Sequence, residues 1–270
     1  NIIGSRLKRD VKKHQLVRNK DLWIKKKIIC VIEARMGSKR FPGKSLVKLD
    51  KDNTLIDYVI KNTLKSSYFF NNNTYILTSD SINNKPLIKY IKKKYSIKLI
   101  IGSENNVFSR YLKFKNRKNF PILRLTGDNP MIDPILIDRF VEIFIKKKID
   151  YITTRGMTHS TNWKVRSSFP KGISLEAFYS NMFFSKEKKF NQHNQEFPTW
   201  FFFNKKIKAK IRKFNSFGNY KNLDQLSSFT LDEKKDYDRL KKFIEKHKCK
   251  PGINNIWNIC GKNKINFIER

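Results

Sequence analysis

The sequence predicts an α/β fold built on a mostly parallel central sheet. Short apolar runs alternate with amphipathic helical patterns from residue 28 to residue 152. This alternation is typical of chains that place helices against a parallel sheet. A loop rich in glycine, lysine and arginine follows the first apolar run, at the sheet edge where open α/β folds bind ligands. These two observations predict an α/β domain with an anion site at its strand ends.

Each element rests on its own local pattern. Continuous apolar runs predict five buried strands, and apolar residues spaced three and four apart predict the helices between them. Thr54 is an expected helix N-cap, and Asp133 followed by Pro134 predicts another helix start with Asp at the N-cap. The expected strands are residues 27–32, 74–77, 97–101, 122–125 and 151–152, and the expected helices include residues 55–64, 87–91, 107–114 and 134–144.

The pattern loosens beyond residue 152. We expect a strand at residues 173–178, an aromatic strand at 197–203 and a final helix at 233–247. No internal repeat and no Pro/Gly-rich linker interrupts the chain, which predicts one domain. Its boundaries are a basic extension at 1–26, the domain at 27–250 and a tail at 251–270. The extension lacks the apolar core of a secretory signal, and its Asp10 and Asp21 are unusual for a transit peptide.

Charge and cysteine content narrow the function classes. The 59 Lys and Arg against 23 Asp and Glu give a formal net charge of +36, which raises the possibility of a nucleic-acid surface. The lysines are spread along the whole chain in short triplets, however, and this favours solvated side chains over one binding face. No apolar run reaches the length of about 18 residues that would predict a membrane span. Three cysteines without C-x-x-C spacing predict neither a disulfide framework nor a zinc site, so a reducing cytoplasm is expected, with Cys30 as a core residue.

The strongest chemical signal is the loop at residues 33–46. Two glycines allow close approach of the backbone to a ligand, and Arg35, Arg40 and Lys44 supply three cations. Backbone N–H groups and guanidinium groups are the donors that phosphate oxygens require. The loop is therefore suited to a nucleoside triphosphate.

The loop departs from two well-known phosphate motifs. A Walker A sequence, G-x-x-x-x-G-K-[ST], would need glycine at position 38, which is Ser38, and would continue directly into a helix. G-x-G-x-x-G is also missing. We therefore exclude a P-loop NTPase and a dinucleotide fingerprint, and a plain basic surface loop stays the alternative.

Four blocks of the sequence together point to a known family. They are A-R-M-G-S-x-R-F-P-G-K-x-L at 34–46, G-S-E-N-N-V-F-S-R-Y at 102–111, R-L-T-G-D-N-P-M-I-D-P at 124–134, and T-L-D-E with D-Y at 230–237. In this order they resemble the SpsF-type cytidylyltransferases of spore coat polysaccharide biosynthesis, relatives of CMP-Kdo and CMP-acylneuraminate synthetases. The resemblance covers roughly residues 27–245. In the second block Asn106 stands where the family has Asp.

The resemblance implies a Rossmann-like nucleotide-diphospho-sugar transferase fold and transfer of CMP from CTP to a sugar hydroxyl, with loss of pyrophosphate. Arg35 and Lys44 are the implied catalytic cations. Asp128, in a turn after a predicted strand, and Asp232 would hold Mg²⁺, although turn capping and helix capping are the alternatives for these two residues. The implied nucleotide-binding residues are Ala34, Gly37, Ser38, Arg40, Thr78, Ser79, Gly102, Ser103 and Asp128.

Two segments thought to shape the sugar pocket depart from the family. F-P-D-G-x-D-x-E becomes F-P-K-G-I-S-L-E at 169–176, which keeps Glu176 but introduces Lys171. R-E-H-x-T becomes Q-E-F-P-T at 195–199, which keeps Glu196. Glu176 and Glu196 are the expected sugar-binding residues. Because other family residues of these segments are replaced, the sequence specifies neither the sugar nor whether activity is complete.

The histidines and the aromatic run give weaker evidence about function. The four histidines form no triad or metal cluster in the sequence, and we expect His159 and His193 to be exposed in polar loops. The aromatic run at 200–203 could stack on bases, but core or dimer contact is the favoured interpretation. The leading hypothesis is a Mg²⁺-dependent CMP-sugar synthetase acting on an acidic sugar, with a homodimer implied by the relatives. The alternatives are a basic nucleic-acid-binding protein on the same scaffold and a catalytically silent relative.

Overall fold

The structure is a computed structural model that describes residues 28–115, 119–147, 149–155, 168–185, 187, 191–203, 209–223 and 227–262. The predicted extension at 1–26 and His159 lie outside the described residues.

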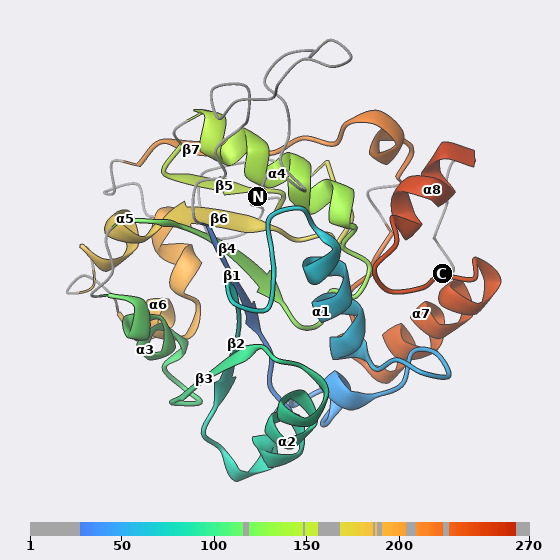
Figure 1. Cartoon of the computed structure of the whole chain (residues 1–270), viewed down its shortest axis with the longest axis horizontal. Helices are drawn as coiled ribbons and strands as arrows, with labels where there is room; N and C mark the ends of the chain where they lie inside the picture. The colour runs from blue at the N-terminus through green and yellow to red at the C-terminus, as the bar shows by residue number, and fades with distance from the viewer. Residues whose placement is uncertain are drawn as a thin grey trace, which may run out of the picture.

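A seven-stranded sheet forms the centre of the described part of the chain, in the order β3-β2-β1-β4-β6-β5-β7 (Figure 1). β6 runs antiparallel to both of its neighbours, β4 and β5, and the other pairings are parallel. The mostly parallel sheet is therefore confirmed. The strands are β1 (Ile29–Glu33), β2 (Thr74–Ser79), β3 (Lys98–Gly102), β4 (Pro121–Thr126), β5 (Tyr151–Thr153), β6 (Glu176–Tyr179) and β7 (Ile211–Lys213).

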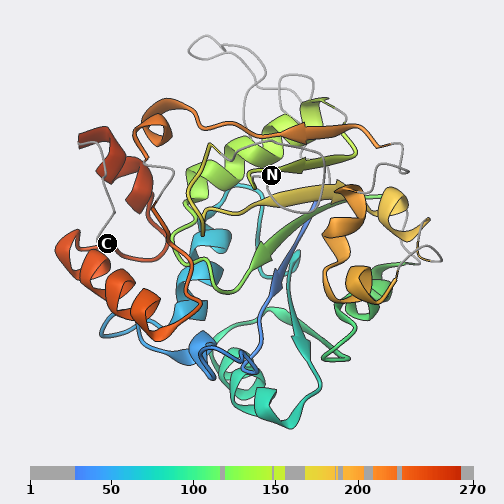
Figure 2. The ribbon, with the colours of Figure 1, turned by 180° about the vertical axis from the view of Figure 1, so that it is seen from behind.

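Helices cover both faces of this sheet (Figures 1 and 2). One face carries α1 (Leu55–Lys65), α2 (Lys85–Lys94), α4 (Pro134–Lys147), α7 (Lys234–Lys246) and α8 (Asn255–Lys262). The other carries α3 (Val107–Tyr111), α5 (Ser180–Phe184) and the 3₁₀ segments η4 (Leu112–Phe114) and η6 (Pro198–Phe203), with α6 (Gln192–Glu196) beside α3. Three more 3₁₀ segments are η2 (Lys44–Leu46), η3 (Ile82–Asn84) and η7 (Gly218–Asn222). α8 lies within residues 251–270, where the sequence predicts a tail.

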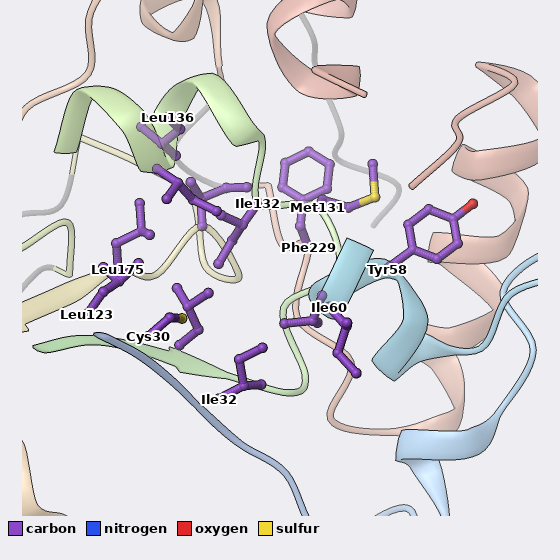
Figure 3. Close-up of a cluster of buried hydrophobic side chains, with 14 of the residues drawn as sticks. Cys30, Ile32, Tyr58, Ile60, Leu123, Met131, Ile132, Leu136, Leu175 and Phe229 are labelled. Carbon is purple, nitrogen blue, oxygen red and sulfur yellow. The ribbon is translucent and has the colours of Figure 1, made fainter. Parts of the chain in front are cut away.

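The two faces of β1 show why its apolar run is continuous. Cys30 and Ile32 point into the core beneath α1 and α4, where Ile60 and Leu136 also lie (Figure 3). Ile29 and the next odd-numbered residue, Val31, enter a second, aromatic-rich core on the opposite face. Successive strand side chains alternate between faces, so a strand covered on both sides must be apolar throughout. The expected burial of Cys30 is confirmed, and that burial raises the pKa of its thiol.

The two residues expected to cap helix N-termini, Thr54 and Asp133, use their side chains differently. Thr54 caps α1 through a reciprocal capping box with Asp57, as predicted. α4 begins at Pro134 as predicted, and the main-chain oxygen of Asp133 accepts the Ile137 N–H at 3.1 Å. The Asp133 carboxylate accepts hydrogen bonds from the N-terminal backbone of α8, 2.7 Å from the Trp257 nitrogen and 3.3 Å from that of Ile256.

The aromatic strand expected at 197–203 is wrong. Residues 198–203 form the 3₁₀ segment η6, and the adjacent Phe201 and Phe202 are both buried in the same aromatic-rich core. A strand would send these neighbours to opposite faces. Phe202 stacks on Tyr151 with ring centroids 4.5 Å apart, so tertiary packing decides the conformation.

None of the helices in the described ranges is long and apolar enough to cross a membrane.

Candidate functional site

The carboxyl ends of three neighbouring strands bring the predicted loops together. Ala34, directly after β1, donates its backbone N–H to Leu77 O of β2 at 3.1 Å. Gly127, after β4, donates to Glu33 O at 2.7 Å. A Cβ at Gly127 would lie 2.9 Å from the Ala34 side chain, so glycine permits this contact. The loop after β1 and the turn that carries Asp128 therefore share one sheet edge.

The loop after β1 is closed by its own backbone. Met36 O accepts hydrogen bonds from the Ser38 and Gly43 nitrogens, each at 2.9 Å. Gly43 has a φ of +77°, in the left-handed region that favours glycine. Lys44 is the first residue of the short segment η2, and α1 does not begin until Leu55, which agrees with the exclusion of a P-loop.

Asn84 fixes the start of this loop from a neighbouring element. Its Oδ1 accepts the Met36 N–H at 2.7 Å, and its Nδ2 donates to the Ser79 hydroxyl. Asn84 and Ser79 are both fully buried. A buried amide thus ties the loop to the end of β2, an anchor that no sequence motif indicated.

Lys44 lies at the centre of the site. Its Nζ is 2.7 Å from Leu231 O, 3.3 Å from Asp128 Oδ2 and 3.4 Å from Asp232 Oδ1. Asp128 O accepts the Leu231 N–H at 2.9 Å, which holds the two carboxylate-bearing segments together. The structure therefore joins three predicted residues that lie as much as 188 positions apart in the sequence.

Asp232 is surrounded by cations. In addition to Lys44, Oδ2 of Asp232 lies 3.1 Å from Arg40 Nη2 and 2.9 Å from Lys171 Nζ. Burial by itself raises the pKa of Asp232, but these three cations outweigh burial and lower it. The carboxylate is therefore ionised at neutral pH. Glu233, not Asp232, is the N-cap of α7, so Asp232 is not required for capping.

The pair Asp128 and Asp232 fits a magnesium ion in donor type. Both offer hard carboxylate oxygens, and a single ammonium group contacts both. No set of three or more His, Cys, Asp or Glu side chains that could hold a metal ion occurs within the described ranges. Mg²⁺ usually takes one or two carboxylates and completes its shell with water and substrate phosphates. Two carboxylates beside the predicted triphosphate site would meet that requirement.

Four of the implied nucleotide-binding residues, Thr78, Ser79, Gly102 and Ser103, lie at the ends of β2 and β3. Thr78 is fully buried, and its hydroxyl has no partner among the described residues. Gly102 O accepts the Asp80 N–H at 2.9 Å, and Ser103 O accepts from the buried Arg110 at 2.7 Å. These contacts hold the strand ends in position, and nucleotide binding by these residues stays a prediction.

Two neighbours of this region were not predicted as site residues. A Cβ at Gly37 would lie 2.6 Å from Glu104 Oε1, so this carboxylate lies against the loop after β1. Glu104 belongs to the second sequence block, which was the available signal. Asn106, the departure in that block, caps α3 by accepting the Ser109 N–H at 2.9 Å, as an Asp would.

The two expected sugar-binding glutamates differ in environment. Glu176 is 2% exposed, and its oxygens accept hydrogen bonds from Arg124, Tyr151 and Thr199. Arg124 also pairs with Glu33, at 2.9 and 2.6 Å. Burial raises the pKa of Glu176, but Arg124 and its other partners lower it below the usual value.

Glu196 lies exposed at the end of α6, on the aromatic-rich face of the sheet. His193, on the same helix, is exposed as expected and contacts the rings of Phe197 and Trp200. Contact of either glutamate with a sugar stays a prediction.

This fold and site define an α/β protein in which cations of the loop after β1 face a pair of carboxylates. The family model described as Cytidylyltransferase matches residues 29–254, and the chain belongs to that family. It is a family of nucleotidyltransferase enzymes.

Two curated proteins are similar to different shares of the chain. Over 231 residues it is 28% identical to the spore coat polysaccharide biosynthesis protein SpsF of Bacillus subtilis, covering 84% of this chain and 90% of that protein. It is 31% identical over 117 residues to a 3-deoxy-manno-octulosonate cytidylyltransferase of Leptospira interrogans, covering 42% of this chain and 44% of that protein.

Solved structures agree on the fold. A cytidylyltransferase from Leptospira borgpetersenii superposes with a TM-score of 0.73 at 23% identity, covering 88% of this chain and 94% of that one. A CMP:2-keto-3-deoxy-manno-octonic acid synthetase complexed with CTP superposes with a TM-score of 0.55 at 15% identity. The match covers 82% of this chain and 99% of that one. The nucleotide-diphospho-sugar transferase fold is therefore shown.

Proposed function

We propose that this protein is a Mg²⁺-dependent CMP-sugar synthetase that transfers CMP from CTP to a sugar hydroxyl and releases pyrophosphate. The single observation that carries the proposal is the position of Lys44, at the end of a backbone-closed loop and within 3.4 Å of both Asp128 and Asp232. The groups proposed to bind phosphate and metal are adjacent in this arrangement, which supports attack on a nucleoside triphosphate.

The nucleotide and the acceptor class rest on the relatives. One relative acts in spore coat polysaccharide biosynthesis and another is a 3-deoxy-manno-octulosonate cytidylyltransferase. Their names support CTP as the donor, an acidic sugar as the acceptor and a role in surface polysaccharide or glycan synthesis.

Each part of the site has a task in this proposal. Arg35, Arg40 and Lys44 neutralise the triphosphate and the departing pyrophosphate. The Gly37 N–H is the backbone donor for phosphate oxygens, since the Ser38 N–H is bonded to Met36 O. Asp128 and Asp232 would hold the magnesium ion, which supplies charge neutralisation at the α-phosphate. Asn84 keeps the loop in register through Met36.

A pyrophosphate-release assay with CTP and a panel of 3-deoxy-ulosonic acids and other sugars tests the proposal. Lys44→Met and Asp128→Asn should each lower turnover by about 10²-fold or more, as loss of an electrostatic group at a reacting phosphate does. Lys89→Met on α2 and Asp238→Asn on α7 are the charge-matched controls, since both residues are exposed. Wild-type turnover that survives in both site variants would refute the site, and no turnover with any sugar would favour a silent relative.

A further inference from the structure

The ammonium group of Lys44 has the surroundings of a bound cation. Three oxygens contact it, from Leu231 O and the carboxylates of Asp128 and Asp232, and its side chain is only 13% exposed. We propose that Lys44 takes the place of the divalent cation in the nucleotide-free protein, so that the metal ion enters together with the triphosphate. The inference rests on the proposed function, because it uses the same carboxylate pair.

Electrostatic repulsion explains why Lys44 and the metal ion would not occupy this place at the same time. A divalent cation bound by Asp128 and Asp232 while Lys44 remained between them would lie within a few ångströms of an ammonium group. At an effective dielectric constant of 20, two unit charges about 4 Å apart interact by about 4 kcal/mol, and the double charge of the ion increases the repulsion. Lys44 and the metal ion therefore compete for the same oxygens.

Lys171 adds a second competitor at Asp232. Its Nζ lies 2.9 Å from Oδ2, the oxygen that Arg40 also contacts. The Lys171 side chain is 64% exposed, so it can leave more readily than Lys44. Position 171 departs from the family motif that residues 169–176 resemble, because that motif has Asp where this chain has Lys. The lysine makes this chain's Asp232 less available to a free metal ion than an aspartate at position 171 would.

The triphosphate is the group that can draw Lys44 away. Lys44 follows Gly43 in the closed loop, so its stem starts at the phosphate site while its head reaches the carboxylates. Phosphate oxygens would offer the ammonium a new partner and complete the shell of the ion that replaces it. By linkage, CTP must then raise the affinity for the metal by the same factor by which the metal raises the affinity for CTP.

Binding of Mn²⁺, followed by its electron paramagnetic resonance signal, tests the inference without turnover. Mn²⁺ shares the preference of Mg²⁺ for carboxylate and phosphate oxygens. In the absence of nucleotide, Lys44→Met should bind Mn²⁺ about tenfold more tightly than the wild type, and Lys171→Met about two- to fivefold. The double variant Lys44→Met/Asp232→Asn should lose the gain, and Lys89→Met should match the wild type.

The outcomes separate this inference from the proposed function. If wild-type protein binds Mn²⁺ equally well with and without CTP, or if neither Lys44→Met nor Lys171→Met binds Mn²⁺ more tightly while wild-type turnover is normal, the exchange is refuted and the function stands. If the wild type neither binds Mn²⁺ with CTP nor releases pyrophosphate, both are refuted. Lys171 is exposed, so its variant remains informative even if Lys44→Met unfolds.

Discussion

The ammonium of Lys171 lies 2.9 Å from Oδ2 of Asp232, and the backbone beside both residues is held in place. Phe229 N donates to Lys171 O at 2.7 Å, which pairs the turn at 171–172 with the segment leading to Asp232. Gly172 has a φ of +91°, and a Cβ there would lie 2.2 Å from Thr230 N. This turn therefore requires glycine for both conformation and space.

Gly172→Ala should destabilise the protein by about 3 kcal/mol or more, because backbone strain and a clash with fixed backbone add together. Gly252→Ala is the matched control. Its φ is +83°, but a Cβ there would meet nothing closer than 3.8 Å, so we expect about 1 kcal/mol from strain alone. Urea unfolding of both variants measures the loss in the free energy of unfolding. Equal losses for the two variants would contradict the close approach at Gly172.

Asn84→Ala should raise the KM for CTP about tenfold through the loss of the hydrogen bond that positions Met36, with a smaller effect on kcat. Asn84→Asp keeps an acceptor for the Met36 N–H and for the Ser79 hydroxyl, so it should restore most of the affinity. Steady-state kinetics with CTP measures the split. If Asn84→Ala altered only the free energy of unfolding, its role in positioning the loop would be disproved.

Glu176→Gln should lower the free energy of unfolding by about 3 kcal/mol, because it leaves the buried Arg124 with one carboxylate fewer. Glu196→Gln changes an exposed residue and should shift it by less than about 0.5 kcal/mol. Urea unfolding separates the two. If Glu176→Gln proved as stable as the wild type, the buried ion-pair network would have no structural role.

Asp133 predicts a dependence of stability on pH. Burial raises its pKa to about 7 despite hydrogen bonds from Trp257 and Tyr220. The folded state therefore holds a proton that the unfolded chain has already released, so stability from this group is full below the unfolded pKa and falls as pH rises toward 7. Between about pH 5 and pH 8, the wild type should lose about 2 kcal/mol relative to Asp133→Asn. Urea unfolding of both proteins across this range measures the difference, and parallel curves would rule out a raised pKa.

Local patterns predicted the parallel strands and their helices because burial on both faces makes strands such as β1 continuously apolar. The local patterns gave wrong predictions where contacts between distant parts of the chain determine the conformation or the partner of a residue. The stacking of Phe202 on Tyr151 selects a 3₁₀ segment, and the carboxylate of Asp133 caps α8, which lies more than 120 residues further along the chain.

In the candidate site, too, some residues were predictable from local sequence and others were not. The cations of the phosphate loop and Asp128 stood out through residue type and position after predicted strands. The anchor at Asn84 did not, because a buried asparagine between a strand and a helix has no distinctive spacing. That Lys171 contacts Asp232 depends on pairing between segments about 60 residues apart, which no local pattern encodes.

A crystal structure with CTP and Mg²⁺ tests the central claim most directly. The triphosphate should lie along the loop at residues 35–44, with the magnesium ion on Asp128 and Asp232 and the Lys44 ammonium turned from these carboxylates toward a phosphate. A triphosphate bound away from Lys44, or a metal ion that leaves both aspartates untouched, would contradict the account.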